Sequence, residues 1–423
     1  MTPGAQVAAA LDLLEHAITV GEKPFDVIIT HYFKQRRYAG SQDRRTILEL
    51  VYGVLRNFYK LFYVAQEKFS HEVSARLYLL AYLKLILDKK EVDLDSLFSG
   101  IGYAPSKITP PEQNFFKNLQ AEIVKWPEWA HANIPEFLWP EVQNIFGVKA
   151  LSEAESLNQE ATVDLRVNPL KTNRDFIKKS LESENIESIE TLYSPLGLRL
   201  KKRVNLTNHP LYQQGLFEFQ DEASQLVSIL CDVQGNETVL DYCAGAGGKT
   251  LALAGLMDNK GHIDAYDVSS TRLRKAELRA QRTGCQNVHF LTNVSDRTYD
   301  RVLIDAPCSG TGTWRRHPEW RVTITPENLK KFISLQKEII FKAVQNVKTG
   351  GRLIYVTCSL LACENEEIME NFLENHSEFK AVPISGVWEK LLKVPCPTAS
   401  SFLRFTPHQH KTDGFFIAIF EKK

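Results

Sequence analysis

The sequence has no long hydrophobic run, no paired cysteine spacing and no net charge, and each absence excludes a class of protein. No stretch of about 18 apolar residues occurs, so no membrane-spanning helix is predicted. The first ten residues lack the basic flank of a secretory signal. Seven cysteines without paired spacing indicate a reducing compartment. We therefore expect a cytoplasmic protein without membrane partners.

Patterns for metal binding and for indiscriminate nucleic-acid coating are missing as well. The sequence contains no Cys-x-x-Cys motif and no cluster of histidines of the kind that binds zinc, so we expect no metal. The formal net charge is zero, which argues against a protein that coats nucleic acid without selectivity. Binding to RNA would require a local basic surface.

The chain of 423 residues is long enough for two or three domains, and 43% hydrophobic residues suffice for packed cores. Residues 1–140 have helical periodicity, including a stretch over residues 46–65. Residues 141–215 mix short strands with one helix and predict a small α+β unit. In residues 216–423 strands alternate with helices, which predicts an α/β domain with a doubly wound sheet. Its strands are expected at residues 239–243, 262–267, 288–292, 301–307 and 352–359, with a late strand at 415–420.

Two cysteine motifs each follow an apolar run that is typical of a buried parallel strand. They are Asp305-Ala306-Pro307-Cys308-Ser309-Gly310 and Thr357-Cys358-Ser359. Ligands of open α/β sheets bind at the carboxyl ends of the strands, so both thiols and Asp305 are expected to face one pocket. A thiolate is the strongest protein nucleophile near neutral pH, and covalent chemistry follows from this arrangement. Cys231 and Cys285 are interpreted as packing residues.

A glycine-rich turn follows the first strand of the α/β domain, at residues 243–250. A phosphate-binding P-loop would need glycine at Cys243, and a dinucleotide fingerprint would need glycine at Thr250. S-adenosylmethionine needs close backbone approach but no phosphate cradle. Asp267 ends the next strand, where a carboxylate can accept both ribose hydroxyls. Dinucleotide-binding proteins share this last feature, so it does not discriminate alone.

Taken together, these motifs resemble the RsmB/Sun family of S-adenosylmethionine-dependent RNA cytosine carbon-5 methyltransferases. The resemblance is carried by residues 241–250, 305–312 and 357–359, and also by Gln220-Asp221-Glu222-Ala223-Ser224 and Lys411-Thr412-Asp413-Gly414-Phe415-Phe416. It implies a class I, Rossmann-like methyltransferase domain with a C-terminal antiparallel hairpin. It also implies a NusB-like helical domain and a small RRM-like subdomain before it. We expect a monomer.

The resemblance also implies roles for individual residues. Cys358 matches the nucleophile that attacks carbon 6 of cytosine, and Cys308 matches the cysteine that assists release. Asp305 would hydrogen-bond the base and lie close to the cofactor. The cofactor residues implied are Cys243, Ala244, Gly245, Ala246, Gly247, Gly248, Lys249, Asp267, Asn293 and Asp305. Asn293 stands where the family usually has an acid for the adenine ring, with Asp296 nearby.

Two stretches are candidates for contact with RNA. Seven basic residues lie between Lys34 and Lys60, against only two acidic ones. They form either a solvated helix face or an RNA-facing surface. Residues 314–321 interleave tryptophan with arginine, which suits stacking on single-stranded RNA or an aromatic lid on the sheet. The resemblance favours 16S ribosomal RNA over transfer RNA.

Other functions remain open at this point. A DNA cytosine methyltransferase would use the Pro-Cys thiol and usually has glutamine after it, where this chain has Ser309. An oxidoreductase would explain the glycine turn but not two cysteines at strand ends. A catalytically silent ribosome-assembly factor would keep the fold and be expected to lose a thiol or Asp305.

Overall fold

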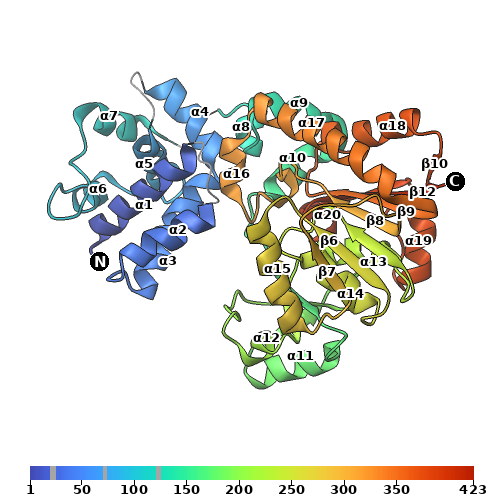
Figure 1. Ribbon diagram of the computed structural model, residues 1–423. Coiled ribbons are helices and arrows are strands. Elements are labelled where there is room, and N and C mark those ends of the chain that lie inside the picture. Colours follow the sequence, from blue (N-terminus) through green and yellow to red (C-terminus); the bar gives the residue numbers. More distant parts are fainter. Residues whose placement is uncertain (20–24, 70–73, 121–124) are drawn as a thin grey trace. The chain divides into compact units, whose positions relative to one another are not determined.

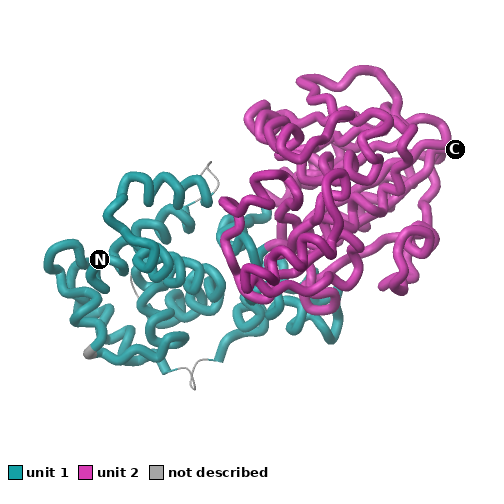
Figure 2. Tube along the Cα trace, turned by 90° about the horizontal axis from the view of Figure 1, so that it is seen from below, with its two compact units in different colours: residues 1–160, 314–326 teal, residues 161–313, 327–423 magenta. Residues whose placement is uncertain are grey.

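The computed structural model describes residues 1–19, 25–69, 74–120 and 125–423 (Figure 1). Contacts divide this part of the chain into two units. The first comprises residues 1–160 and 314–326, and the second comprises residues 161–313 and 327–423 (Figure 2). The predicted domains have boundaries at residues 140 and 215, whereas the two units follow from contacts and have other boundaries. The predicted domain boundaries stay a prediction. No helix among the described residues is long and apolar enough to cross a membrane.

The first unit is entirely helical, as predicted. Its first helix begins at Pro3 after Thr2, whose Oγ1 accepts a hydrogen bond from the Ala5 N–H at 3.3 Å. Leu13 and Leu14 of this helix are fully buried in the core of the unit. The helices are α1 (Pro3–Ile18), α2 (Phe25–Gln35), α3 (Ser41–Leu55), α4 (Phe58–Lys68), α5 (Ala75–Leu85), α6 (Glu91–Leu97), α7 (Pro110–Asn118), α8 (Glu128–Ala132), η1 (Glu136–Leu138), α9 (Trp139–Phe146), η2 (Gly147–Lys149) and α10 (Ala150–Ser156).

The stretch of helical periodicity over residues 46–65 forms two helices, because α3 ends at Leu55 and α4 begins at Phe58. A buried asparagine from elsewhere in the chain stabilises the break. Asn133 donates from Nδ2 to the Arg56 carbonyl at 2.6 Å and accepts from the Tyr59 N–H at 2.8 Å. It thereby satisfies backbone groups that a helix end leaves without partners.

Residues 314–326 belong to the first unit, although the sequence places them after the Cys308 motif. Helix α16 (Pro318–Thr323) packs against α1 and α3. Trp314 and Arg321 are buried, with the guanidinium 4.9 Å from the centre of the indole ring. These two side chains cannot stack on RNA while they are buried, so the interpretation of residues 314–321 as a stacking surface is wrong for them. Trp320 is partly exposed and stacks on His317 at 4.3 Å.

The second unit contains a small antiparallel sheet in the order β2-β3-β1-β4. Its elements are β1 (Val163–Val167), α11 (Arg174–Ser183), β2 (Ser188–Glu190), β3 (Gly197–Leu200), α12 (Pro210–Gln213) and β4 (Phe217–Phe219). Asn173 caps the N-terminus of α11, because its side chain accepts from the Phe176 N–H at 2.9 Å. An α+β subdomain is present as expected from the sequence, but residues 141–160 belong to the first unit and β4 lies beyond residue 215.

The large sheet has the order β10-β12-β9-β8-β5-β6-β7, and β11 pairs with β12. Neighbours from β9 to β7 are parallel, and β12 is antiparallel to β9, β10 and β11, as the predicted fold requires. The strands are β5 (Thr238–Asp241), β6 (His262–Tyr266), β7 (Val288–Leu291), β8 (Tyr299–Asp305), β9 (Val347–Thr357), β10 (Phe379–Ala381), β11 (Phe402–Phe405) and β12 (Phe415–Lys422).

Helices cover both faces of this sheet, and each face has its own apolar core. Figure 1 shows α17 and α18 over one face and α13, α14 and α19 over the other. Because β5 to β9 run parallel, their carboxyl ends lie at one edge of the sheet, where the following loops meet. The helices are α13 (Glu222–Leu230), α14 (Gly248–Leu256), α15 (Ser270–Thr283), η3 (Thr311–Thr313), α17 (Pro326–Ala343), η4 (Val344–Asn346), η5 (Ala362–Glu364), α18 (Glu366–Asn375), α19 (Ile384–Leu391) and α20 (Pro407–His410).

Candidate active site

The two cysteines predicted to share a pocket are adjacent in the structure. Cys308 follows β8 and Cys358 follows β9, two parallel strands in which Asp305 pairs with Val356. The two Sγ atoms lie 3.4 Å apart, within hydrogen-bond distance of each other. Both loops are tied together, since the Gly312 N–H donates to the Cys358 carbonyl at 2.9 Å. Two thiols in contact can act on one substrate atom or on two steps of one reaction.

The contact between the thiols makes them chemically different. The hydrogen bond to Cys358, together with burial, raises the pKa of Cys308 well above its usual value. Cys308 therefore remains a thiol near neutral pH and can donate its proton to the other sulfur. This geometry suits a pair in which one sulfur attacks and the other holds a proton.

A cation and a carboxylate lie beside the thiols. Lys249 Nζ donates to Asp305 Oδ2 at 2.6 Å, and it lies 5.1 Å from the centre of the Phe415 ring. Burial acts to lower the pKa of Lys249, but the Asp305 carboxylate, with a smaller effect from Cys358, outweighs burial and raises it. Lys249 is therefore an ammonium group whose charge stabilises negative charge in the site. The Asp305 side chain is about one-third exposed, so its carboxylate can face a substrate while Oδ2 accepts from Lys249.

The glycine turn between β5 and α14 has the open backbone that the sequence predicts. Gly245 and Gly247 adopt positive φ angles of 55° and 83°. At Gly247 an added Cβ would lie 2.8 Å from the Ala276 Cβ, so a side chain there would clash. At Gly245 an added Cβ would meet nothing within 4 Å, which leaves room for a ligand against the backbone. The Ala244 N–H donates to the Tyr266 carbonyl at 2.8 Å and ties the turn to β6.

Asp267 joins this turn from the end of β6. Its Oδ2 accepts from the Gly245 N–H at 2.9 Å, and its Oδ1 accepts from the Ser269 N–H at 2.8 Å. Each oxygen keeps a second lone pair for a hydroxyl donor. A carboxylate would repel a phosphate at this position, whereas it suits a ribose. The turn and Asp267 therefore fit S-adenosylmethionine better than a nucleotide whose phosphates lie on the turn.

The remaining cofactor residues predicted from the sequence lie at the same edge of the sheet or in the turn. Cys243, Ala246 and Gly248 belong to the turn, and burial raises the pKa of the Cys243 thiol well above its usual value. Cys243 therefore contributes backbone to the site and is not a candidate nucleophile. Asn293 is exposed two residues after β7, and Asp296 is exposed in the same loop. The contact of either residue with adenine stays a prediction.

Sequence reasoning missed the residues that hold the glycine turn from behind. Arg279 of α15 donates from Nη1 to the Ala246 carbonyl at 2.6 Å, and Arg166 of β1 donates to the Gly248 carbonyl at 2.6 Å. Buried Glu218 of β4 accepts from Arg279 at 2.7 Å and also from Arg282. Burial lowers the pKa of Arg166 to about 10, which leaves it charged. The available signal was the pattern of charged residues inside otherwise apolar strands β1 and β4.

Two motifs far apart in the sequence close the site from another side. The Asp413 N–H donates to both oxygens of Asp221 at 3.0 Å, which joins residues 220–224 to residues 411–416. The Gly414 N–H donates to the Gly312 carbonyl at 2.8 Å. An added Cβ at Gly312 would lie 2.3 Å from the Gly414 carbonyl oxygen, so this approach requires glycine.

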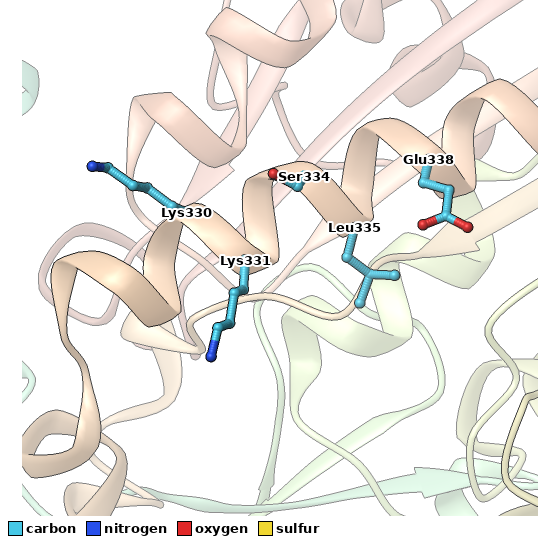
Figure 3. Close-up of a pocket in the computed structure, with 5 residues that line it drawn as sticks. All are labelled: Lys330, Lys331, Ser334, Leu335 and Glu338. Carbon is cyan, nitrogen blue, oxygen red and sulfur yellow. The ribbon is translucent and has the colours of Figure 1, made fainter.

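Two further features lie apart from these residues. His262 and Asp264 of β6 meet His289 of β7, with possible ligand atoms within 4.8 Å of one another. Arg297 already donates to His262 at 2.9 Å and to Asp264 at 3.3 Å, so we assign no metal there. A shallow cavity of about 350 Å³ on α17 is lined by Lys330, Lys331, Ser334, Leu335 and Glu338, and it includes none of the predicted site residues (Figure 3).

Comparison with protein families gives two matches. The model for the 16S rRNA methyltransferase RsmB/F matches residues 228–421. The model for the ferredoxin-like domain of RsmF/B-like methyltransferases matches residues 134–207. The first match contains both cysteine motifs and the glycine turn, and the second contains most of the small sheet.

Individual proteins are similar over most of the chain. A probable ribosomal RNA small subunit methyltransferase B from Synechocystis is 31% identical, over 92% of this chain and 93% of its own length. The 28S rRNA (cytosine-C(5))-methyltransferase of Mus musculus is 32% identical, over 73% of this chain and 40% of its own length. The crystal structure of PH0851 is 27% identical with a TM-score of 0.79, and the likeness covers 100% of this chain and 99% of that one.

Proposed function

The chain belongs to the RsmB/F family of 16S rRNA methyltransferases, and from this premise we propose that Cys358 forms a covalent bond to the cytosine that the enzyme methylates. The enzyme is an S-adenosylmethionine-dependent rRNA cytosine carbon-5 methyltransferase. S-adenosylmethionine, when bound against the glycine turn and Asp267, supplies the methyl group. The proposal concerns how the residues of this chain make carbon 5 reactive.

Carbon 5 of cytosine is a poor nucleophile, and the contact between the two thiols is the observation that carries the proposal. The Cys358 sulfur adds to carbon 6, and carbon 5 becomes enamine-like and takes the methyl group. The proton on carbon 5 then passes to solvent water, its bonding pair re-forms the carbon 5–carbon 6 double bond, and Cys358 leaves as a thiolate. Cys308, whose raised pKa keeps it protonated 3.4 Å away, assists this release by donating a hydrogen bond to the departing sulfur.

Lys249 and Asp305 supply the electrostatic part of the site. The Lys249 ammonium can stabilise negative charge that develops on the base during attack, because opposite charges attract strongly in a partly buried site. Asp305 accepts a hydrogen bond from the Lys249 ammonium on one oxygen and can accept another from the exocyclic amine of cytosine on the other. This arrangement selects cytosine over uracil, which has a carbonyl at that position.

The substrate is RNA, and we propose small-subunit ribosomal RNA rather than transfer RNA, in the cytoplasm, with the protein acting as a monomer. A target cytosine inside a helix has to leave its stack, at a cost of about a few kcal/mol. Lys34, Arg37 and Arg45 of the first unit are exposed and could supply phosphate contacts. Arg45 already pairs with Glu49 at 2.9 Å, so Lys34 and Arg37 are the stronger candidates.

The test uses tritiated S-adenosylmethionine with three separate substrates: naked 16S rRNA, bulk transfer RNA and DNA. We expect label in 16S rRNA, located by bisulfite sequencing at a cytosine. Label in transfer RNA alone would contradict the ribosomal substrate, and label in DNA alone would contradict RNA methylation. No label in any substrate, with intact cofactor binding, would favour a silent assembly factor.

A further inference from the structure

Two consecutive buried side chains each hold one of the two cysteine loops. Glu364 ends η5, and Asn365 follows it immediately before α18. Both side chains are fully buried, at 0% exposure. Polar groups are buried in this way only when hydrogen bonds replace their water contacts. The partners of these two residues therefore indicate why they are buried.

Glu364 binds the loop that carries Cys308. Its Oε1 accepts from the Ser309 N–H at 2.9 Å, and its Oε2 accepts from the Ser309 hydroxyl at 2.5 Å. Gln336 of α17 adds a third donor at 2.9 Å. Glu364 forms no salt bridge within the described residues, so its charge is balanced by these hydrogen bonds alone. Ser309 is the neighbour of Cys308, and the carboxylate fixes the backbone at that point.

Asn365 binds the loop that carries Cys358, on both sides of the cysteine. Its Oδ1 accepts from the Thr357 hydroxyl at 2.6 Å, and its Nδ2 donates to the Ser359 carbonyl at 2.9 Å. The two loops also meet directly, since the hydroxyls of Ser309 and Ser359 lie 3.2 Å apart. One short segment of backbone thus connects the supports of both thiols.

We propose that Glu364 and Asn365 are positioning residues that together set the separation between the Cys308 and Cys358 sulfur atoms. The purpose of this separation rests on the proposed function, because attack and release need both sulfurs at one base. The separation itself is a geometric property that can be measured without RNA. The negative charge of Glu364 also contributes to the raised pKa of Cys308, which keeps that group a proton donor.

The experiment uses disulfide formation as a ruler for the two sulfurs. The full-length protein is equilibrated with oxidised glutathione, which takes two electrons from the dithiol, forms one Cys308–Cys358 bond and releases two molecules of reduced glutathione. Peptide mass spectrometry measures the fraction of protein that contains the Cys308–Cys358 disulfide. The equilibrium constant from this fraction is the effective concentration of one thiol near the other. We expect Glu364→Ala and Asn365→Ala each to lower this concentration about tenfold, because each frees one loop.

A matched control separates positioning from loss of stability. Phe372→Leu changes a buried residue of α18 that packs on Phe379 and Phe420, so it should lower the melting temperature and leave the effective concentration unchanged. Ser309→Ala removes one hydroxyl from the same contact and should lower the concentration about threefold in a protein that folds. Glu364→Gln keeps the shape of the side chain and should restore the concentration while changing the pH profile of methylation.

The kinetic result is separate from the ruler. Glu364→Ala and Asn365→Ala should lower kcat and leave KM for S-adenosylmethionine within twofold, since neither residue contacts the glycine turn. Unchanged effective concentrations in Glu364→Ala, Asn365→Ala and Ser309→Ala would overturn the positioning proposal. A failure of the proposed function would instead appear as wild-type protein without methylation whose thiols still respond to these variants.

Discussion

Arg279→Ala should weaken cofactor binding although the side chain is directed at the back of the glycine turn. Arg279 donates to the Ala246 carbonyl at 2.6 Å and to Glu218 at 2.7 and 3.3 Å. A hydrogen bond from a charged donor contributes about 1.5–3 kcal/mol. Glu218 keeps Arg282 as a second partner, and Arg279 is 26% exposed, so we expect the lower part of that range. The free energy of unfolding should fall by about 2 kcal/mol.

The binding assay is titration calorimetry with S-adenosylmethionine. Without Arg279 the turn has to be ordered by the ligand, and we expect Kd to rise about tenfold, which is about 1.4 kcal/mol. Arg279→Lys should fall between the wild type and alanine, because one ammonium reaches fewer acceptors than a guanidinium. Arg274→Ala is the control, since Arg274 lies on the same helix in an exposed pair with Glu277. Wild-type affinity in Arg279→Ala, or equal weakening in Arg274→Ala, would refute the reasoning.

Three further predictions concern ionisable side chains. Burial raises the pKa of Asp241 to about 7, so the folded protein keeps this proton to higher pH than the unfolded chain, and the free energy of unfolding should fall as pH rises from about 4 to about 7. Asp241→Asn should reduce that slope in urea unfolding at pH 5 and pH 8, and an unchanged slope would contradict the burial argument. Asp267→Ala should weaken S-adenosylmethionine binding by about 1–3 kcal/mol in calorimetry, and unchanged affinity would remove Asp267 from the site. Replacing Lys34 and Arg37 with glutamate should weaken RNA binding and reduce the slope of log K against log salt by about 1.5, whereas an equal slope would mean a merely solvated surface.

The sequence was sufficient for the parts of the site that depend on local pattern. Two apolar runs, followed by the motifs that contain Asp305, Cys308 and Cys358, predicted parallel strands. Parallel strands bring their carboxyl ends to one edge of a sheet. The glycine turn was predicted because glycine permits backbone conformations and a close backbone approach that other residues do not. The antiparallel position of the C-terminal strand came from resemblance rather than from periodicity, and the order of the strands was not predicted.

The parts that sequence reasoning missed depend on contacts between distant residues. Asn133 divides the stretch of helical periodicity at Arg56 and Tyr59, which are more than 70 positions away. Arg279 of α15 reaches Ala246 in the glycine turn, and no pattern within α15 distinguishes Arg279 from the exposed Arg274. Glu364 and Asn365 have the composition of an ordinary helix start.

Residues 314–326 show the same limit at the level of whole segments. Interleaved tryptophan and arginine suited either a surface for RNA or an aromatic lid, and Trp314 and Arg321, which belong to the helical unit, are buried. A buried arginine is rare, and it is tolerated here because Arg321 lies over an indole ring and donates to the Leu157 carbonyl at 3.3 Å. Composition alone does not distinguish that packing from an exposed stacking surface.

The central claim is that Cys358 attacks the base and Cys308 releases it, and trapping of the covalent complex tests it most directly. Cys308→Ala, Cys358→Ala and the double variant are incubated with 16S rRNA and S-adenosylmethionine and separated on a denaturing gel. We expect a slow-migrating protein–RNA band with Cys308→Ala alone, lost after ribonuclease treatment, because attack proceeds and elimination does not. Cys358→Ala and the double variant should form no band. A band with Cys358→Ala and none with Cys308→Ala would reverse the two roles and contradict the account.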